Sequence, residues 1–241
     1  MENVPHIFIN SVLCALGSGS LDTIVESLPS QIWAKLATDH CSRLTDWLLC
    51  FWKKEDKLLG ILKRYNSQGI YKIDFASFED FAKKDPRYNR ITDIVMDKQF
   101  GLNAAFYEPD NPWTKIESAK DVESLKRRFF WRINCDDFVS LRLNVVDSVG
   151  MHSAIIGHLV QKCVGVEMLT LDYSSPVSTE LLRICVHTNW LTVVEIRGAW
   201  PLETTLRLLE TLTRQEQLEH LHCRLDDTCD ALESLLRKIG F

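Results

Sequence analysis

One apolar pattern recurs four times in the second half of the chain and limits the folds open to it. An apolar residue is followed by two variable residues, a second apolar residue, one variable residue and a third apolar residue. The four copies are Phe138-x-x-Leu141-x-Leu143, Val166-x-x-Leu169-x-Leu171, Leu191-x-x-Val194-x-Ile196 and Leu218-x-x-Leu221-x-Cys223. Their third apolar residues lie 28, 25 and 27 positions apart. A period of this length is typical of chains built from stacked copies of one small unit.

A stretch with helical spacing of apolar residues follows each copy of the template. The four stretches are residues 153–162, 178–186, 202–212 and 229–239. A strand followed by a helix in every unit is the pattern of leucine-rich repeats, which this half of the chain resembles. Cys163, three residues before Val166, is similar to the cysteine of the cysteine-containing subtype. The resemblance implies an irregular α/β solenoid, in which each unit buries its strand face by stacking on its neighbours.

Weaker copies of the template precede these four. They are Ile70-x-x-Ile73-x-Phe75 and Ile91-x-x-Ile94-x-Met96. Phe78 and Phe81, between the two copies, predict a short helix. Met96 lies 47 residues before Leu143, which is close to two periods. The repeat region is therefore expected to begin between Ile70 and Phe138.

An irregular insert is expected between these weaker copies and the clear repeats. Residues 101–113 contain Pro109, Asn111 and Pro112, which favour turns. Residues 118–128 are predicted to form a helix, and the aromatic run at 129–133 predicts an extra strand.

The first forty residues predict three short helices. Between Pro5 and Leu16 the apolar residues fall on one helical face, and Pro5 suits a first turn. A second helix is expected from about Leu21 and a third over residues 31–40. Residues 41–65 are predicted to continue as a connecting helix. The apolar positions that suggest it are Leu44, Trp47, Leu48, Phe51, Leu58 and Leu62, which step by three, four or seven.

The N-terminal pattern resembles an F-box over about residues 4–40. Val4-Pro5, the apolar helix after it, Ser20-Leu21 and Trp33 carry the resemblance. It implies docking on the Skp-type adaptor of a cullin–RING ubiquitin ligase. The residues expected at that interface are Pro5, Phe8, Ile9, Val12, Leu16, Leu21 and Trp33, with Trp33 locking the helices together. Alternatively, these helices only cap the apolar end of the repeats.

Alternation along the predicted strands selects a candidate binding face. Successive side chains of a strand point to opposite faces, so an inward Leu141 and Leu143 leave the residues beside them pointing outward. The outward set predicted to bind a target protein is Arg142, Asn144, Thr170, Asp172, Glu195, Arg197, His222 and Arg224. A solvated face without a partner would show the same pattern.

Charge, apolar runs and cysteine spacing argue against several classes of function. The net charge of −5 gives no electrostatic case for nucleic-acid binding. No run of 18 apolar residues predicts a membrane span. The apolar stretch at residues 7–16 follows Glu2 and no Lys or Arg, so a secretory signal is not expected. The eight cysteines include no CxxC pair. We expect reduced, mostly buried thiols in a cytoplasmic or nuclear protein.

No cofactor, metal or catalytic site is predicted. His220 and His222 would point outward from a strand while Cys223 points inward, so the three do not converge on a metal. Residues 126–132 mix basic and aromatic side chains, which could contact a single-stranded nucleic acid. The favoured interpretation is a basic helix end followed by a buried strand.

These expectations define one hypothesis. The chain has an F-box-like helical motif at 1–42, a connecting helix at 43–69 and an irregular leucine-rich-repeat region at 70–241. It resembles divergent F-box proteins with leucine-rich repeats, of the kind numerous in nematodes. The resemblance implies a substrate-recognition subunit of a ubiquitin ligase that performs no chemistry itself. The alternative is a repeat scaffold that binds proteins without any ligase.

Overall fold

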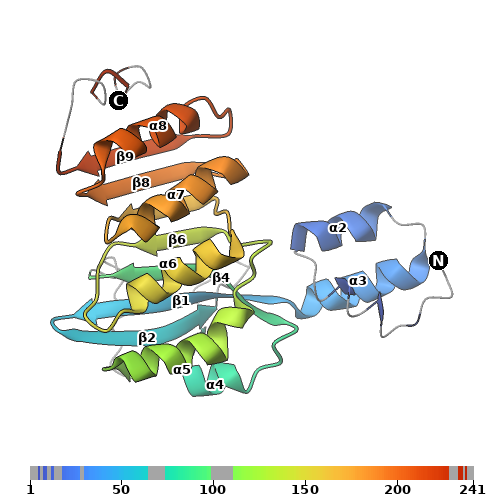
Figure 1. Cartoon of the computed structure of the whole chain (residues 1–241). Coiled ribbons are helices and arrows are strands. Elements are labelled where there is room, and N and C mark those ends of the chain that lie inside the picture. The colour runs from blue at the N-terminus through green and yellow to red at the C-terminus, as the bar shows by residue number, and fades with distance from the viewer. Residues whose placement is uncertain are drawn as a thin grey trace.

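The computed structural model describes residues 5, 8–9, 12–13, 18–27, 30–64, 74–98, 111–227, 233–235 and 237. An α/β body is built on one mixed, mostly parallel sheet. Two helices, α2 (Ser18–Ser27) and α3 (Gln31–Arg43), lie to one side of this body (Figure 1). No helix of the described residues is long and apolar enough to cross a membrane.

Within the described residues, the sheet has nine strands in the order β3-β2-β1-β4-β6-β7-β8-β9, with β5 paired to β2. They are β1 (Thr45–Lys54), β2 (Lys57–Arg64), β3 (Asp74–Ala76), β4 (Asn89–Asp97), β5 (Thr114–Ile116), β6 (Ser140–Leu143), β7 (Met168–Asp172), β8 (Val193–Gly198) and β9 (His220–Leu225). From β1 through β4 to β9, neighbouring strands are parallel. Antiparallel pairing is confined to β2 and its partners, at one end of the sheet.

The helices of the body cover one face of the sheet (Figure 1). They are α4 (Phe78–Ala82), α5 (Ala119–Phe129), α6 (Met151–Lys162), α7 (Pro176–Thr188) and α8 (Leu202–Leu212). Each of β6, β7 and β8 is followed by its own helix, which confirms three of the four predicted units. The helix predicted at 229–239 lies mostly outside the described residues. The opposite side of the sheet, which carries none of the described helices, is called the helix-free face below.

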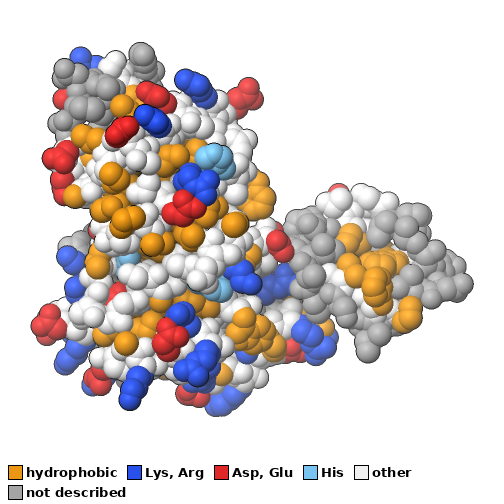
Figure 2. Space-filling view, in the orientation of Figure 1, with side chains coloured by type: hydrophobic (Ala, Val, Ile, Leu, Met, Phe, Trp, Pro, Cys, Tyr) orange, Lys and Arg blue, Asp and Glu red, His pale blue; other side chains and the backbone are white. Residues whose placement is uncertain are grey.

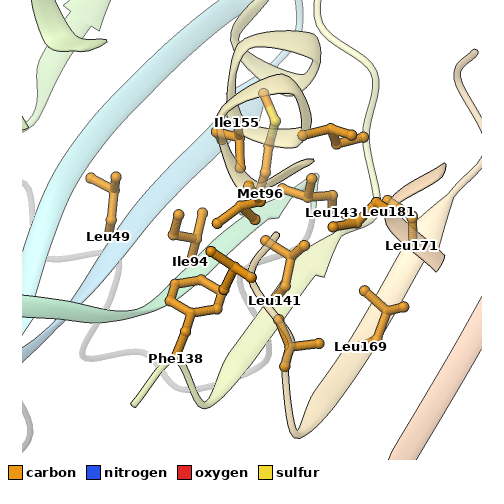
Figure 3. Packing of buried hydrophobic residues seen from close by; sticks show 14 of the residues in the cluster. Leu49, Ile94, Met96, Phe138, Leu141, Leu143, Ile155, Leu169, Leu171 and Leu181 are labelled. Atoms are coloured by element: carbon orange, nitrogen blue, oxygen red, sulfur yellow. The ribbon is translucent and has the colours of Figure 1, made fainter. Parts of the chain in front are cut away.

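The apolar template forms the core because its positions stay in register from strand to strand. Met96 pairs with Leu143, Leu143 with Leu171, and Leu171 with Ile196. A second row two residues earlier is fully buried and runs through Ile94, Leu141, Leu169 and Val194. Figure 3 shows Ile94, Met96, Leu141, Leu143, Leu169 and Leu171 packed together with Ile155 and Leu181 from the covering helices. The period found in the sequence is therefore the step from one strand to the next.

The connecting helix predicted over 41–65 is wrong. Helix α3 ends at Arg43, and β1 and β2 form an antiparallel hairpin in which Lys54 faces Lys57. Glu55 makes the turn with a positive φ of 54°, without the glycine or asparagine that marks most such turns. Residues 47–51 are buried on both faces of the sheet, and such a strand reads as a continuous apolar run.

The extra strand predicted at 129–133 is also wrong. Helix α5 continues to Phe129, and a single turn of 3-10 helix, η2 (Phe130–Arg132), follows it. Two Arg132 nitrogens, Nη1 and Nη2, donate to the carbonyls of Phe81 and Ala82 at 2.9 and 3.3 Å. These bonds hold the turn against α4, so the aromatic run does not extend into a strand.

Of the two weaker copies of the template, the one at residues 91–96 joins the parallel rows, and the described part of the one at residues 70–75 does not. Strand β4 contains Ile94 and Met96 and joins the parallel rows as predicted. Because β4 and β6 are direct neighbours, the 47 residues between Met96 and Leu143 span one step with an insert and not two periods. Phe75 lies in β3, which is antiparallel and outside those rows, and Ile70 and Ile73 are outside the described residues.

The N-terminal helices have a small core of their own. It contains Ile9, Leu13, Leu21, Trp33 and Ala37, which are all buried. Trp33 therefore lies inside a small apolar cluster formed by the described N-terminal residues.

A compact junction joins the cluster to the body. The Arg43 guanidinium lies 3.9 Å from the centre of the Tyr88 ring, and the His40 ring lies 4.9 Å from it. The Thr45 amide donates to the Tyr88 carbonyl at 2.7 Å. Helix α3 therefore leads into β1 with only Leu44 between them.

Candidate functional site

The first predicted row of outward residues lies on the helix-free face. It consists of Arg142, Thr170, Glu195 and His222, which pair one with the next across β6, β7, β8 and β9. Arg142 is exposed and the other three are half-buried. Adjacent strands lie about 4.8 Å apart, so the four side chains form a continuous line. The apolar residues on either side of each are buried, or half-buried at Cys223, against the helices, which confirms the predicted alternation.

The second predicted row is parallel to the first. Asp172 pairs with Arg197 and Arg197 with Arg224, while Asn144 follows β6 directly. Arg197 Nη2 donates to Glu195 Oε1 at 2.6 Å, and Arg224 Nε donates to His222 Nε2 at 2.9 Å. These bonds link the two rows on β8 and on β9.

Two acceptors in the second row are short of donors. Asn144 donates through Nδ2 to Asp97 Oδ2 at 3.0 Å, but its own Oδ1 is buried and receives no hydrogen bond from the described residues. Asp172 Oδ1 is also buried and receives no hydrogen bond from the described residues. Burial raises the pKa of the Asp172 carboxyl, while Arg197 and Lys98 act in the opposite direction. A buried acceptor without a donor costs about 1–3 kcal/mol, so a ligand that donates here would gain from it.

The other end of the helix-free face is apolar. Leu48, Cys50 and Ile61 from β1 and β2 are buried there, and Trp52 and Trp113 pack against them. Burial raises the pKa of the Cys50 thiol far above its usual range, which keeps it protonated and unreactive. The polar rows on β6 to β9 are therefore the part of this face that suits a protein partner.

An acidic pocket that the sequence reasoning missed lies at the edge where the parallel strands begin. Its volume is about 390 Å³. It is lined by Asp46, Thr92, Asp136, Asp137, Phe138, Val139, Glu167, Trp190, Thr192 and Gln217. Trp190 is 51% exposed at its rim. Burial, and then the Asp137 carboxylate, raise the pKa of Asp46, which Arg90 partly offsets.

A sequence signal for this pocket existed. Glu167 and Thr192 stand immediately before the first residues of β7 and β8, and Asp136 and Asp137 precede the first clear template. Equivalent positions of parallel strands meet at one edge of a sheet. Glu167 and Thr192 occupy the first variable position of the template, whereas the predicted outward rows were taken only from its later positions, so both residues were passed over.

The residues predicted to contact an adaptor divide into two groups. Phe8 is 55% exposed, Pro5 is exposed and Val12 is half-buried, so these can meet a partner. Ile9 and Leu21 are fully buried within the cluster, where they pack the helices together. Leu16 lies outside the described residues. Figure 2 shows apolar side chains gathered on the visible surface of this cluster.

Among the described residues, no group of three or more His, Cys, Asp or Glu side chains is placed to hold a metal ion. The His220 and His222 rings are stacked with their centres 6.5 Å apart on the helix-free face, while Cys223 packs against the core on the other face. The chain matches no family model, no curated protein and no solved structure in the comparisons made. What the site offers chemically is donors, acceptors and both signs of charge on a continuous face, which suits protein recognition.

Proposed function

We propose that this protein is a non-catalytic substrate receptor of a cullin–RING ubiquitin ligase. Its strand–helix units act as an irregular leucine-rich-repeat solenoid and bind a target protein on the helix-free face. Its N-terminal helices dock on a Skp-type adaptor. The observation that carries the proposal is the pair of polar rows, held in register across β6 to β9 on the face that the described helices leave uncovered.

The chemistry of these rows supports a protein target. Arg142 and Arg224 are exposed, and Glu195 and Arg197 are fixed by their mutual hydrogen bonds. Such pre-ordered charges lose little side-chain entropy when a partner binds. Repeat proteins commonly use an extended strand face of this kind for binding.

The N-terminal cluster supports adaptor docking. Its apolar residues are mostly inside, yet Phe8 remains 55% exposed on a helical residue next to the buried Ile9. An exposed aromatic side chain on a short helix is suited to the mode in which a helix inserts apolar residues into a groove.

The junction between the N-terminal cluster and the α/β body supports a fixed spacing between adaptor and target. The contacts of His40 and Arg43 with Tyr88 fix α3 against the body. A target on the sheet would then be held at a set distance from the adaptor, as transfer of ubiquitin within an assembled ligase requires.

The test is co-purification of the full chain with the Skp-type adaptor of its host. The test variant is Phe8→Ser, and the matched control is Val177→Ser, which removes a similarly exposed apolar side chain from α7. We expect the wild type and Val177→Ser to retain the adaptor and Phe8→Ser to lose most of it. If the wild type retains no adaptor where another F-box protein does, the chain is instead a repeat scaffold that binds proteins without a ligase.

A further inference from the structure

The basic and aromatic segment at residues 126–132 is only partly explained by the core. Lys126 and Arg127 lie in the last turn of α5, as expected for a basic helix end. However, Trp131 is not buried as expected. It is 60% exposed, more than any other large apolar side chain among the described residues.

Two cavities flank this indole. One, of about 490 Å³, is lined by Glu123, Lys126, Arg127, Phe130, Trp131, Ile133, Cys135, His158 and Lys162. The other, of about 460 Å³, is lined by Pro86, Arg87, Arg90, Trp131, Arg132, Ile133, Asn134, Cys135 and Asp136. Both volumes are in the range of ordinary ligand pockets. Trp131, Ile133 and Cys135 belong to both cavities, so the two form one surface, called the Trp131 site below.

Positive charge dominates the Trp131 site. Arg127 and Lys162 make no ion pair with any described residue. Glu123 is neutralised by Lys126, whose Nζ lies 2.7 Å from its carboxylate. Asp136 is the remaining carboxylate. Figure 2 shows Lys and Arg side chains over the part of the helix-covered face that contains α5.

Arg132 fixes the indole and leaves one donor unused. Its guanidinium carbon lies 5.3 Å from the centre of the Trp131 ring, while its two terminal nitrogens donate to backbone carbonyls of α4. The side chain is buried, and its Nε donates to none of the described residues. The cation–π contact orders Trp131 before any partner arrives.

Two histidines lie close to cations that line the site. Burial, and then Lys162, lower the pKa of His158. Burial, and then Arg90, Arg43 and Arg87, lower the pKa of His40. Lys162 and Arg90 therefore add to the effect of burial, which is the larger cause at both histidines.

We propose that the Trp131 site binds a segment of a partner protein that presents an anionic group, a carboxylate or a phosphate ester, beside an apolar side chain. The apolar side chain packs on the exposed Trp131 indole. The anionic group pairs with Arg127 and Lys162, where charge-assisted hydrogen bonds are strong.

A protein segment suits the site better than a nucleic acid. Single-stranded nucleic acids stack successive bases on several aromatic side chains along a basic groove. Here one exposed indole stands between two adjoining cavities that share Ile133 and Cys135 in their walls. The net charge of −5 also gives no long-range attraction for a polyanion.

The Trp131 site is separate from the proposed target-binding rows. It is built from α5, η2, the end of α6, residues 133–136 and residues 86–90, which lead into β4. Its existence does not depend on the ligase hypothesis, because neither the adaptor nor a target on the helix-free face is required for it.

The test uses fluorescent peptides and the full chain. One short Gly/Ser peptide carries a central Leu followed by Glu, phosphoserine or Gln, and an oligothymidylate is the fourth probe. The site variants are Trp131→Ala and the double change Arg127→Glu with Lys162→Glu. The matched controls are Trp190→Ala, which removes another exposed indole, and Arg207→Glu on α8. Circular dichroism checks that every variant is folded.

We expect the Glu or the phosphoserine peptide to bind more tightly than the Gln peptide. Both site variants should weaken that binding about tenfold, and the controls should change it less than about twofold. The stronger of the two anionic peptides identifies carboxylate or phosphate as the ligand. Equal binding of the Gln peptide, or equal binding by the site variants, would overturn the proposal. Binding of the oligothymidylate alone would replace it with a nucleic-acid site.

Discussion

Replacing neighbouring residues of β6 tests the assignment of the two faces of the sheet. Leu141 is fully buried between Ile94 and Leu169, which are themselves fully buried. Arg142, the next residue, is exposed on the helix-free face and makes no ion pair with any described residue. Leu141→Ala and Arg142→Ala should therefore have very different effects on the free energy of unfolding.

The expected difference follows from burial. Burying a leucine side chain contributes about 1.5–3 kcal/mol, and Leu→Ala changes in packed cores cost about 2–5 kcal/mol. Because the row around Leu141 has no exposed member that could collapse into the space, we expect the upper part of this range, about 3–5 kcal/mol. Arg142→Ala should change stability by less than about 0.5 kcal/mol.

Urea unfolding followed by far-ultraviolet circular dichroism measures both values, provided that the slope of free energy against urea stays the same. At about 2–4 °C per kcal/mol for a chain of this size, Leu141→Ala should also lower the melting temperature by about 6–20 °C. The pair Leu169→Ala and Thr170→Ala should repeat the contrast on β7. Similar costs for the two members of a pair would show that the faces are assigned wrongly.

Three further predictions concern other parts of the body. Gly165→Ala would place a Cβ 2.4 Å from Thr188 Oγ1, so we expect a loss of about 1–3 kcal/mol in urea unfolding, with little added cost in a Thr188→Gly background. Burial lowers the pKa of His152, so the unfolded chain takes up the proton first. The free energy of unfolding should therefore fall as the pH drops below about 6.5, and His152→Phe should reduce that fall. Cys163 is exposed, whereas burial raises the pKa of Cys185 to about 12. Mass spectrometry should find Cys163 alkylated in the native protein and Cys185 alkylated only after unfolding.

The part of the fold that the sequence predicted best is the part with a strict period. In β6 to β9 the third template residues, from Leu143 to Cys223, are register partners. Strands in a parallel sheet repeat the same environment, so their sequences repeat as well. The outward rows followed directly, because Arg142 and its equivalents alternate with buried residues.

The hairpin of β1 and β2 was not predictable by the same reasoning. Its strands are buried on both faces, so Trp47, Leu48 and Phe51 follow each other without the alternation that marks a half-exposed strand. In such a continuous apolar run, pairs of apolar residues three or four positions apart occur by chance, and they led to the wrong prediction of a helix. Its turn at Glu55 also lacks the residues that usually signal a two-residue turn.

The acidic pocket and the exposure of Trp131 were missed for a different reason. Trp131 and Trp190 look like core residues in a one-dimensional pattern, and only the three-dimensional arrangement leaves them exposed. The cavities beside them combine residues far apart in sequence, such as Arg87 with Asn134, or Asp46 with Gln217. The spacing of neighbouring residues in the sequence does not predict contacts between such distant segments.

The receptor hypothesis is tested by comparing the proteins retained from host cells by three forms of the full chain. They are the wild type, a face variant with Arg142→Glu and Arg224→Glu, and a control with Arg207→Glu and Arg214→Glu, which reverses two exposed charges away from the helix-free face. We predict that at least one protein is retained by the wild type and the control and lost by the face variant, while the Skp-type adaptor is retained by all three. The same set of proteins on the face variant as on the wild type would contradict target binding by the polar rows.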